Sequence, residues 1–254
     1  MPPPAPSVEA IINPQHLSPY TGPTGSIEGT ISVTGDPPTD TKVDVGKCPA
    51  AASIYGKAFR EGAKLEDGSR ALADALVAVT EYPGGYVQEK LAARRVSIHD
   101  CAFETRTIDM TFGQKLEVAN RDAKGFYAPV LSLSPTPAVM VPPPNGDPIS
   151  LYPEKPGYGT VSDRMGSPLY ADVYVLLQPL HAVSDLSGHF RIDGVPVGKS
   201  KLSARLRTIN NDASKAIEVH DGVVERIDLV LNFDKNTAPT SVKPDAGPIK
   251  PNIR

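Results

Sequence analysis

Turn-forming residues interrupt this 254-residue chain so often that they decide what it can fold into. The chain contains 21 glycines and 27 prolines, a composition that suits turns and short strands better than helices. Between the turns, short segments alternate apolar and polar residues, as in residues 26–33, 114–120 and 225–231. Strands at this spacing, divided by turns, predict an all-β protein built as a sandwich.

Charge and hydropathy exclude two classes of protein. The formal net charge is −3, which lacks the basic footprint of a nucleic-acid-binding protein. No run of 18 apolar residues occurs, so we expect no transmembrane segment in this chain. No apolar core of a signal peptide follows residues 1–6, and if Met1 is the native start we expect a cytoplasmic protein unless another export route operates.

Proline is concentrated in three segments. Residues 1–24 hold seven prolines, residues 134–156 hold eight and residues 234–254 hold four. We predict an extended arm, an exposed extended loop and an extended tail, each a candidate for contact with a protein partner. The alternative is that the two ends are simply disordered. The prolines with which we expect a partner to make contact are Pro2, Pro3, Pro4, Pro142, Pro143 and Pro144.

Two stretches of the chain resemble a known family. The first runs from residues 96–103, with a Cys-x-Phe pattern, through Phe112 and Gly113 to Asn120-Arg121-Asp122. It resembles the cupredoxin-like (plastocyanin-like) periplasmic proteins of the methylamine-utilisation type. The second, residues 174–198, carries Gly188-His189-Phe190 and Gly194-Val195-Pro196-Val197-Gly198. It is similar to the carboxypeptidase-regulatory-like (transthyretin-like) β-sandwich that follows in such proteins.

The resemblance implies a domain organisation. We expect an arm over 1–24, a cupredoxin-like domain over 25–178, a small carboxypeptidase-regulatory-like domain over 179–233 and a tail over 234–254. It also implies where copper would be bound, because the family places its first His shortly after the Asn-x-Asp motif and then uses a Cys-x-x-His-x-x-Met cluster. The corresponding positions here are Phe126, Arg164, Ser167 and Tyr170.

None of these four residues is a normal ligand of a cupredoxin copper ion, which needs imidazole, thiolate and thioether groups. The sequence therefore predicts a cupredoxin-like domain that has lost its copper site and holds no cofactor. The five histidines have no partner at i+2 or i+4 spacing, and we interpret them as surface or capping residues. No Gly-x-Ser-x-Gly elbow is present, so we expect no enzyme.

Cys48 and Cys101 are the only cysteines and lie 53 positions apart. In an oxidising compartment they would pair and close a loop that stabilises the fold by about 4 kcal/mol. The alternative is two buried free thiols. The family resemblance favours the disulfide.

These observations favour a non-catalytic structural or accessory subunit of the bacterial cell envelope. Because relatives serve electron transfer, we expect a periplasmic protein held at a membrane electron-transfer complex by protein partners. One alternative is a small-molecule or glycan binding module, for which Tyr82, Tyr86, Tyr152 and Tyr158 are the candidate aromatic residues. A second alternative is a copper-handling or electron-transfer protein with an unrecognised site.

Overall fold

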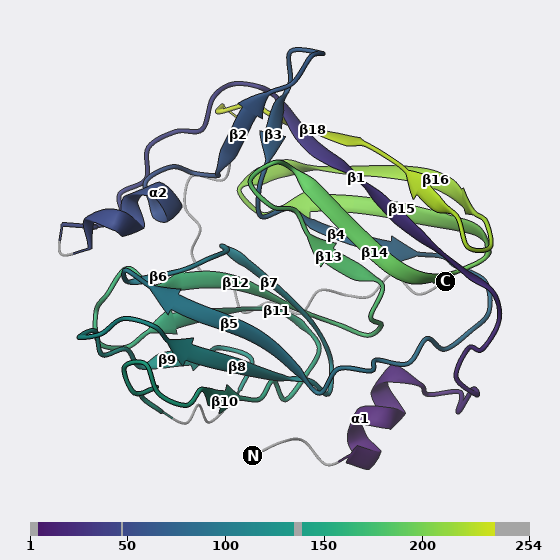
Figure 1. Cartoon of the computed structure of the whole chain (residues 1–254), viewed down its shortest axis with the longest axis horizontal. Helices are drawn as coiled ribbons and strands as arrows, with labels where there is room; N and C mark the ends of the chain where they lie inside the picture. The colour runs from purple at the N-terminus through teal and green to yellow at the C-terminus, as the bar shows by residue number, and fades with distance from the viewer. Residues whose placement is uncertain (1–4, 47, 135–138, 237–254) are drawn as a thin grey trace.

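The computed structural model describes residues 5–46, 48–134 and 139–236, which form two β-sandwiches (Figure 1). These residues are mostly strand, turn and loop, which confirms the predicted all-β class. The helices among them are α1 (Ala5–Ile12), the 3-10 helix η1 (Pro49–Ala51) and α2 (Ala52–Tyr55). No helix in the described part of the chain is both long enough and apolar enough to cross a bilayer.

One sandwich, here called the split sandwich, combines strands from the beginning and the end of the chain. One of its sheets has the order β14-β1-β3-β2, with β17 and β18 also paired to β1, and the other has the order β13-β4-β15-β16. Its strands are β1 (Thr24–Gly35), β2 (Glu61–Lys64), β3 (Arg70–Leu72), β4 (Leu76–Thr80), β13 (His181–Val183), β14 (His189–Pro196), β15 (Gly198–Leu206), β16 (Ile209–Val219), β17 (Val224–Arg226) and β18 (Leu229–Phe233).

The other sandwich, here called the inserted sandwich, is continuous in sequence and lies between β4 and β13. Its sheets have the orders β10-β8-β5-β6 and β7-β12-β11-β9. Its strands are β5 (Ala93–His99), β6 (Ala102–Phe103), β7 (Thr107–Thr111), β8 (Lys115–Asn120), β9 (Pro129–Leu131), β10 (Ile149–Leu151), β11 (Gly157–Asp163) and β12 (Tyr170–Leu176). Each sandwich has its own hydrophobic core.

The predicted domain boundaries, 25–178 and 179–233, are wrong. Strand β1 pairs antiparallel with β14 and parallel with β18, so that Ile27 lies opposite Ile192 and Ile31 opposite Leu229. The buried apolar side chains of β1 and β4 share one core with those of β14, β15 and β18. Residues 24–80 therefore belong with the C-terminal strands, and only residues 93–176 form the inserted sandwich.

Strand β1 lies very close to its parallel neighbour. A Cβ atom at Gly29 would lie 1.9 Å from the carbonyl oxygen of Ile227, so only glycine fits there. The backbone N–H of Ile227 donates to the carbonyl of Glu28 at 2.9 Å. This close approach sets β17 and β18 against β1 and completes the split sandwich.

The N-terminal segment is not the extended arm that its prolines predicted. Helix α1 begins at Ala5, with Pro6 in its first turn, where proline costs no hydrogen bond. Val8 and Ile12, one helical turn apart, pack against the inserted core. Gly113, at a φ of +103°, allows this contact, because a Cβ there would lie 2.8 Å from Val8 Cγ1. The predicted contact residues Pro2, Pro3 and Pro4 lie outside the described residues.

The other two proline-rich segments differ in part from the prediction. Within 134–156, strand β10 pairs with β8, and Pro142 is buried, while Pro143 is exposed and Pro144 is half-buried. Strand β10 therefore interrupts the predicted loop, and residues 139–148 and 152–156 lie outside strands. Of the predicted tail, only residues 234–236 are described.

The two sandwiches meet through polar side chains. All of β7 is buried, although Thr107, Asp109 and Thr111 point away from the inserted core that Ile108 and Met110 fill. Beside them, β12 pairs in register so that Asp172 lies opposite Thr107 and Tyr174 opposite Asp109. The face of β7 that carries Thr107, Asp109 and Thr111 has the polar sequence of a solvent-exposed face, but it is covered at the junction.

Candidate functional site

One end of the inserted sandwich contains Phe126, Arg164, Ser167 and Tyr170, the four residues that the sequence analysis placed at copper-ligand positions. The first loop follows β8 and is organised by Asn120, which is fully buried. Its Nδ2 donates to the carbonyl of Gly125 at 2.7 Å and to that of Pro142 at 3.3 Å. One amide therefore joins the loop that carries Phe126 to the proline-rich loop.

The second loop connects β11 to β12 and is organised by Asp163. Its carboxylate accepts the backbone N–H of Ala128 at 2.7 Å and that of Ser167 at 2.9 Å. Burial acts to raise the pKa of Asp163, but these hydrogen bonds, with one from the Met165 N–H, lower the pKa below its ordinary value. The ionised carboxylate holds the Phe126 loop and the Arg164–Tyr170 loop together.

The residues at the four positions do not fit a copper ion. Phe126 has no donor atom and is 61% exposed, and Arg164 is a permanent cation. Tyr170 turns its hydroxyl to Asp172 Oδ1 at 2.6 Å, where Tyr158 also donates at 2.6 Å. Burial, followed by the charge of Asp172, raises the pKa of Tyr170, which keeps the phenol protonated. Within residues 5–46, 48–134 and 139–236, no three His, Cys, Asp or Glu side chains gather as metal ligands.

A segment from the split sandwich packs against this end. Helices η1 and α2, which lie between β1 and β2 in sequence, place Cys48, Ala51 and Tyr55 against Ala102 of β6. A disulfide joins Cys48 to Cys101, the two cysteines for which the resemblance favoured pairing. The Tyr55 hydroxyl accepts the N–H groups of Phe103 and Tyr170, both at 3.2 Å. The backbone at Tyr170 is therefore held by a tyrosine from the other sandwich.

Replacing Tyr55 by phenylalanine should lower the free energy of unfolding by about 2 kcal/mol, because two buried N–H groups lose their acceptor. Tyr55 is 3% exposed, so water does not readily replace the hydroxyl. Urea unfolding measures the difference. Tyr20→Phe is the matched control, since the Tyr20 hydroxyl bonds the Pro23 carbonyl at an exposed site, and we expect a loss below about 1 kcal/mol there. Equal losses in the two variants would contradict this role of Tyr55.

Large apolar side chains are exposed on the three loops at this end. Phe126 is 61% exposed, Met165 is 60% exposed and Val141, next to Pro142, is 44% exposed. The loops that carry them are joined through Asn120 and Asp163, so these side chains are displayed on ordered backbone. We call Phe126, Val141 and Met165 the loop-end patch.

The sequence interpretation missed a buried histidine at the junction of the sandwiches. The side chain of His181 is 8% exposed, so it is not a surface residue as predicted. Its Nδ1 lies 2.7 Å from Asp109 Oδ2, and its Nε2 lies 3.1 Å from Thr111 Oγ1. This order of groups resembles a catalytic triad, but Thr111 is 1% exposed and its hydroxyl donates to Glu89. The threonine is therefore not placed to attack a substrate.

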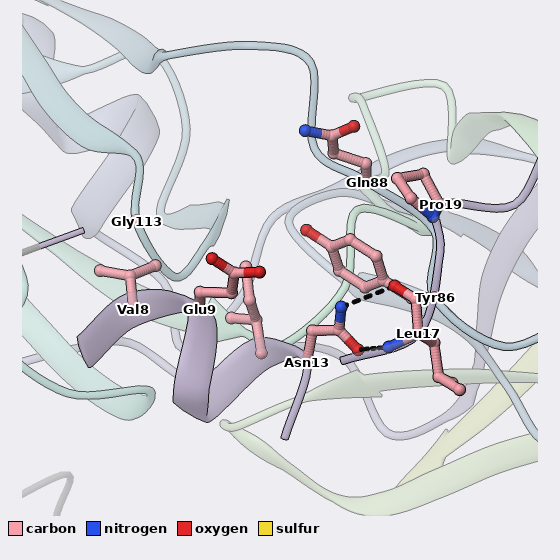
Figure 2. A pocket seen from close by; sticks show the side chains of 9 residues that line it. Val8, Glu9, Asn13, Leu17, Pro19, Tyr86, Gln88 and Gly113 are labelled. Carbon is pink, nitrogen blue, oxygen red and sulfur yellow. Dashed lines mark hydrogen bonds between the residues drawn. The ribbon is translucent and has the colours of Figure 1, made fainter. Parts of the chain in front are cut away.

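A shallow groove lies between α1 and residues 86–88 (Figure 2). The side chain of Asn13, at its edge, both donates to and accepts from the backbone of Leu17, at 2.8 and 2.9 Å. Burial, followed by the charges of Glu9 and Glu89, raises the pKa of Tyr86. The side-chain amide of Asn13 therefore uses its donor and its acceptor to hold the end of α1.

Three of the four tyrosines considered for glycan binding, Tyr82, Tyr86 and Tyr158, lie in different surroundings. Tyr82 packs against the split core, whereas Tyr86 lines the α1 groove. Tyr158 lies at the junction, with the Arg207 guanidinium 4.3 Å from its ring centroid.

No protein-family model and no curated protein matches this chain. Among solved structures, it is similar to a reduced amicyanin variant at 17% identity, covering 35% of this chain and 86% of amicyanin, with a TM-score of 0.28. An oxidized amicyanin variant matches at 19% identity over 40% of this chain and 98% of amicyanin, also at 0.28. The copper-containing nitrite reductase from Thermus scotoductus SA-01 matches at 19% identity over 36% of this chain and 24% of the reductase, with a TM-score of 0.28. These similarities are weak.

Proposed function

We propose that this protein is a non-catalytic structural or accessory subunit of a bacterial cell-envelope assembly, held at the periplasmic face of a membrane electron-transfer complex. The observation that carries this proposal is the loop-end patch. Residues that correspond to copper ligands are replaced there by Phe126, Arg164, Ser167 and Tyr170, and the surrounding loops expose apolar side chains on ordered backbone. A surface of this kind suits a stable contact with another protein.

Two further features support the proposal. The disulfide between Cys48 and Cys101 suits an oxidising compartment such as the periplasm. The two sandwiches are joined by that disulfide, by Tyr55 and by the polar junction, which makes a body able to keep the loop-end patch in a fixed orientation. The placement at an electron-transfer complex is taken from the family resemblance.

Changing the loop-end patch should weaken association at least about tenfold without unfolding the protein. The variant Phe126→Ser/Met165→Ser replaces two side chains that are 61% and 60% exposed, so we expect a stability change within about 0.5 kcal/mol per site. The tagged full chain is purified gently from native membranes, and the proteins that accompany it are identified by mass spectrometry. We expect membrane subunits with the native chain and at least about a tenfold loss with the variant.

Leu186→Ser is the matched control, because Leu186 is 55% exposed but lies on the split sandwich. It should retain the partners. Equal recovery of partners with the loop-end variant and the native chain would contradict the proposed surface. Stoichiometric copper in the native material would contradict the proposed loss of the metal site.

A further inference from the structure

The α1 groove, between α1 and residues 86–88, has the size of a small-molecule site. Its volume is about 380 Å³, within the usual range for such sites. Val8, Glu9 and Ile12 of α1 form one wall, and Tyr86 and Gln88 form the other (Figure 2). Two segments that lie far apart in the sequence therefore build one groove.

The walls of the α1 groove are held in place by contacts within the protein. The Tyr20 N–H donates to the Tyr86 carbonyl at 2.7 Å. The Asn13 side chain holds the backbone of Leu17, just after α1, at 2.8 and 2.9 Å. Val8 and Ile12 also pack against the inserted core, which fixes α1. The groove is therefore already formed before a ligand enters, so that binding costs little ordering of the protein.

Three polar side chains on the lining are left for a ligand. Within the described residues, the Glu9 carboxylate, the Tyr86 hydroxyl and the Gln88 amide have no hydrogen-bond or ion-pair partner. Figure 2 shows the Glu9 carboxylate and the Tyr86 hydroxyl turned toward the same space, although they are not hydrogen-bonded to each other. Glu9 and Gln88 are exposed and Tyr86 is half-buried, so a ligand in the groove reaches these side chains.

The charge of the α1 groove favours a cation. Its lining contains Glu9 but no Lys, Arg or His side chain. After burial, the charges of Glu9 and Glu89 are what raise the pKa of Tyr86, so both carboxylates act on the groove. Glu89 accepts from one backbone N–H and one hydroxyl, both at 2.7 Å, and these neutral groups leave its charge in place. Lys90 is exposed and lies outside the lining. A cation in the groove is therefore attracted and an anion repelled.

The apolar part of the lining suits an alkyl chain. Val8, Ile12 and Leu17 lie in the same groove as the Glu9 carboxylate, and Leu17 is 42% exposed. The face of the Tyr86 ring is a further surface that attracts a cation. An ammonium group carries three N–H donors and no acceptor, which matches a carboxylate and a hydroxyl oxygen that both lack a donor. A chain with a terminal ammonium group therefore satisfies both halves of the groove.

We propose that the α1 groove binds a primary alkylammonium group. The ammonium donates to the Glu9 carboxylate and to the Tyr86 hydroxyl oxygen, and its third N–H faces the open mouth of the groove. The alkyl chain lies against Val8, Ile12 and Leu17. A free small amine and the lysine side chain of a partner protein both carry this group. The site is independent of the proposed docking function, because it lies on α1 and not on the loop-end patch.

Titration of the ¹⁵N-labelled full chain at pH 7 and low salt, followed by amide chemical shifts, tests the proposal. The probes are n-butylammonium, butanol and butyrate, which have the same chain length and differ in charge. We expect butylammonium to bind in the millimolar range and to shift amides at residues 8–13 and 86–88. Butanol and butyrate should bind at least about fivefold more weakly, since neither offers a cation to Glu9 and Tyr86.

Two variants and one control locate the binding. Glu9→Gln keeps the shape of the side chain and should weaken butylammonium binding about threefold or more, the size of an exposed ion pair. Tyr86→Phe keeps the ring, removes the hydroxyl acceptor and should weaken binding about twofold or more. Glu66→Gln is the matched control, because Glu66 is an exposed carboxylate between β2 and β3 of the split sandwich, and we expect native affinity. Amide dispersion reports whether each variant is folded.

A fourth probe, Nα-acetyl-lysine methylamide, distinguishes the two sources of the ammonium group. Tighter binding of this probe than of butylammonium assigns the groove to a lysine side chain of a partner, and weaker binding assigns it to a free amine. Absence of shifts with butylammonium, equal binding of butanol or butyrate, or native affinity in folded Glu9→Gln protein would overturn the proposal.

Discussion

Removing the Cys48–Cys101 disulfide should lower the free energy of unfolding by about 4 kcal/mol. The bond closes a loop with a sequence separation of 53, and the chain-entropy relation gives this magnitude for such a loop. The bond ties the η1–α2 segment to the turn between β5 and β6, so the loss of stability begins at this contact between the two sandwiches. For a chain of this size, a loss of that order lowers Tm by roughly 8–16 °C.

The measurement compares three samples by urea unfolding and calorimetry. They are the oxidised native protein, the native protein under a reducing agent, and the variant Cys48→Ala/Cys101→Ala. The second and third should agree, because both lack the bond while only one has lost the sulfur atoms. A difference below about 1 kcal/mol between oxidised and reduced protein would show that packing around Tyr55 holds the segment without the bond.

The all-β class was predictable because it depends on local signals. Alternation in residues 26–33 and 114–120 and the turns rich in glycine and proline are visible in any short window, and the structure has strands over these segments. Phe126 and Arg164, which the sequence analysis singled out, lie on two neighbouring loops at the end of the inserted sandwich. Hydrogen bonds from Ala128 to Asp163 and from Arg164 to Ala128 bring them together.

Strand partners were not predictable from the same signals. Alternation says which face of a strand is apolar but not which strand lies beside it. Strand β1 therefore read as the start of the cupredoxin-like unit, although Ile31 lies opposite Leu229, far along the chain. The insertion of one sandwich into the other is a property of these long-range pairs.

The burial of polar side chains at the junction was not predictable from the sequence, for a related reason. The alternation of Thr107, Ile108, Asp109, Met110 and Thr111 is that of a half-exposed strand. The polar face is covered by the split sandwich, which buries Asp109 and His181 together. For α1, a signal was present: Val8 and Ile12 stand at i and i+4, a helical spacing that the surrounding prolines masked.

Neutralising Asp74 should lower the free energy of unfolding by about 3 kcal/mol or more, since breaking a buried ion pair leaves its partner uncompensated. Asp74 is 1% exposed and lies between β3 and β4. Its carboxylate accepts from Arg60 Nε and Nη2, both at 2.7 Å, in a bidentate pair. It also accepts from Thr105 Oγ1 and the Arg106 N–H, both at 2.9 Å, in the turn that precedes β7. One carboxylate thus links the split sandwich to the inserted sandwich.

The variant to use is Asp74→Asn, because the φ of +65° at this position is tolerated by asparagine and strained for alanine. Asp40→Asn is the matched control: that pair with Lys57, at 2.6 Å, is exposed, and we expect a loss below about 1 kcal/mol. Adding Arg60→Met to Asp74→Asn should recover part of the loss, since the unpaired cation is then removed as well. The double-mutant cycle consists of the native protein, Asp74→Asn, Arg60→Met and the double variant. Urea unfolding measures the stability of each. Additive losses would mean that Arg60 and Asp74 stabilise the fold separately, and that the junction is held by packing and by the disulfide instead.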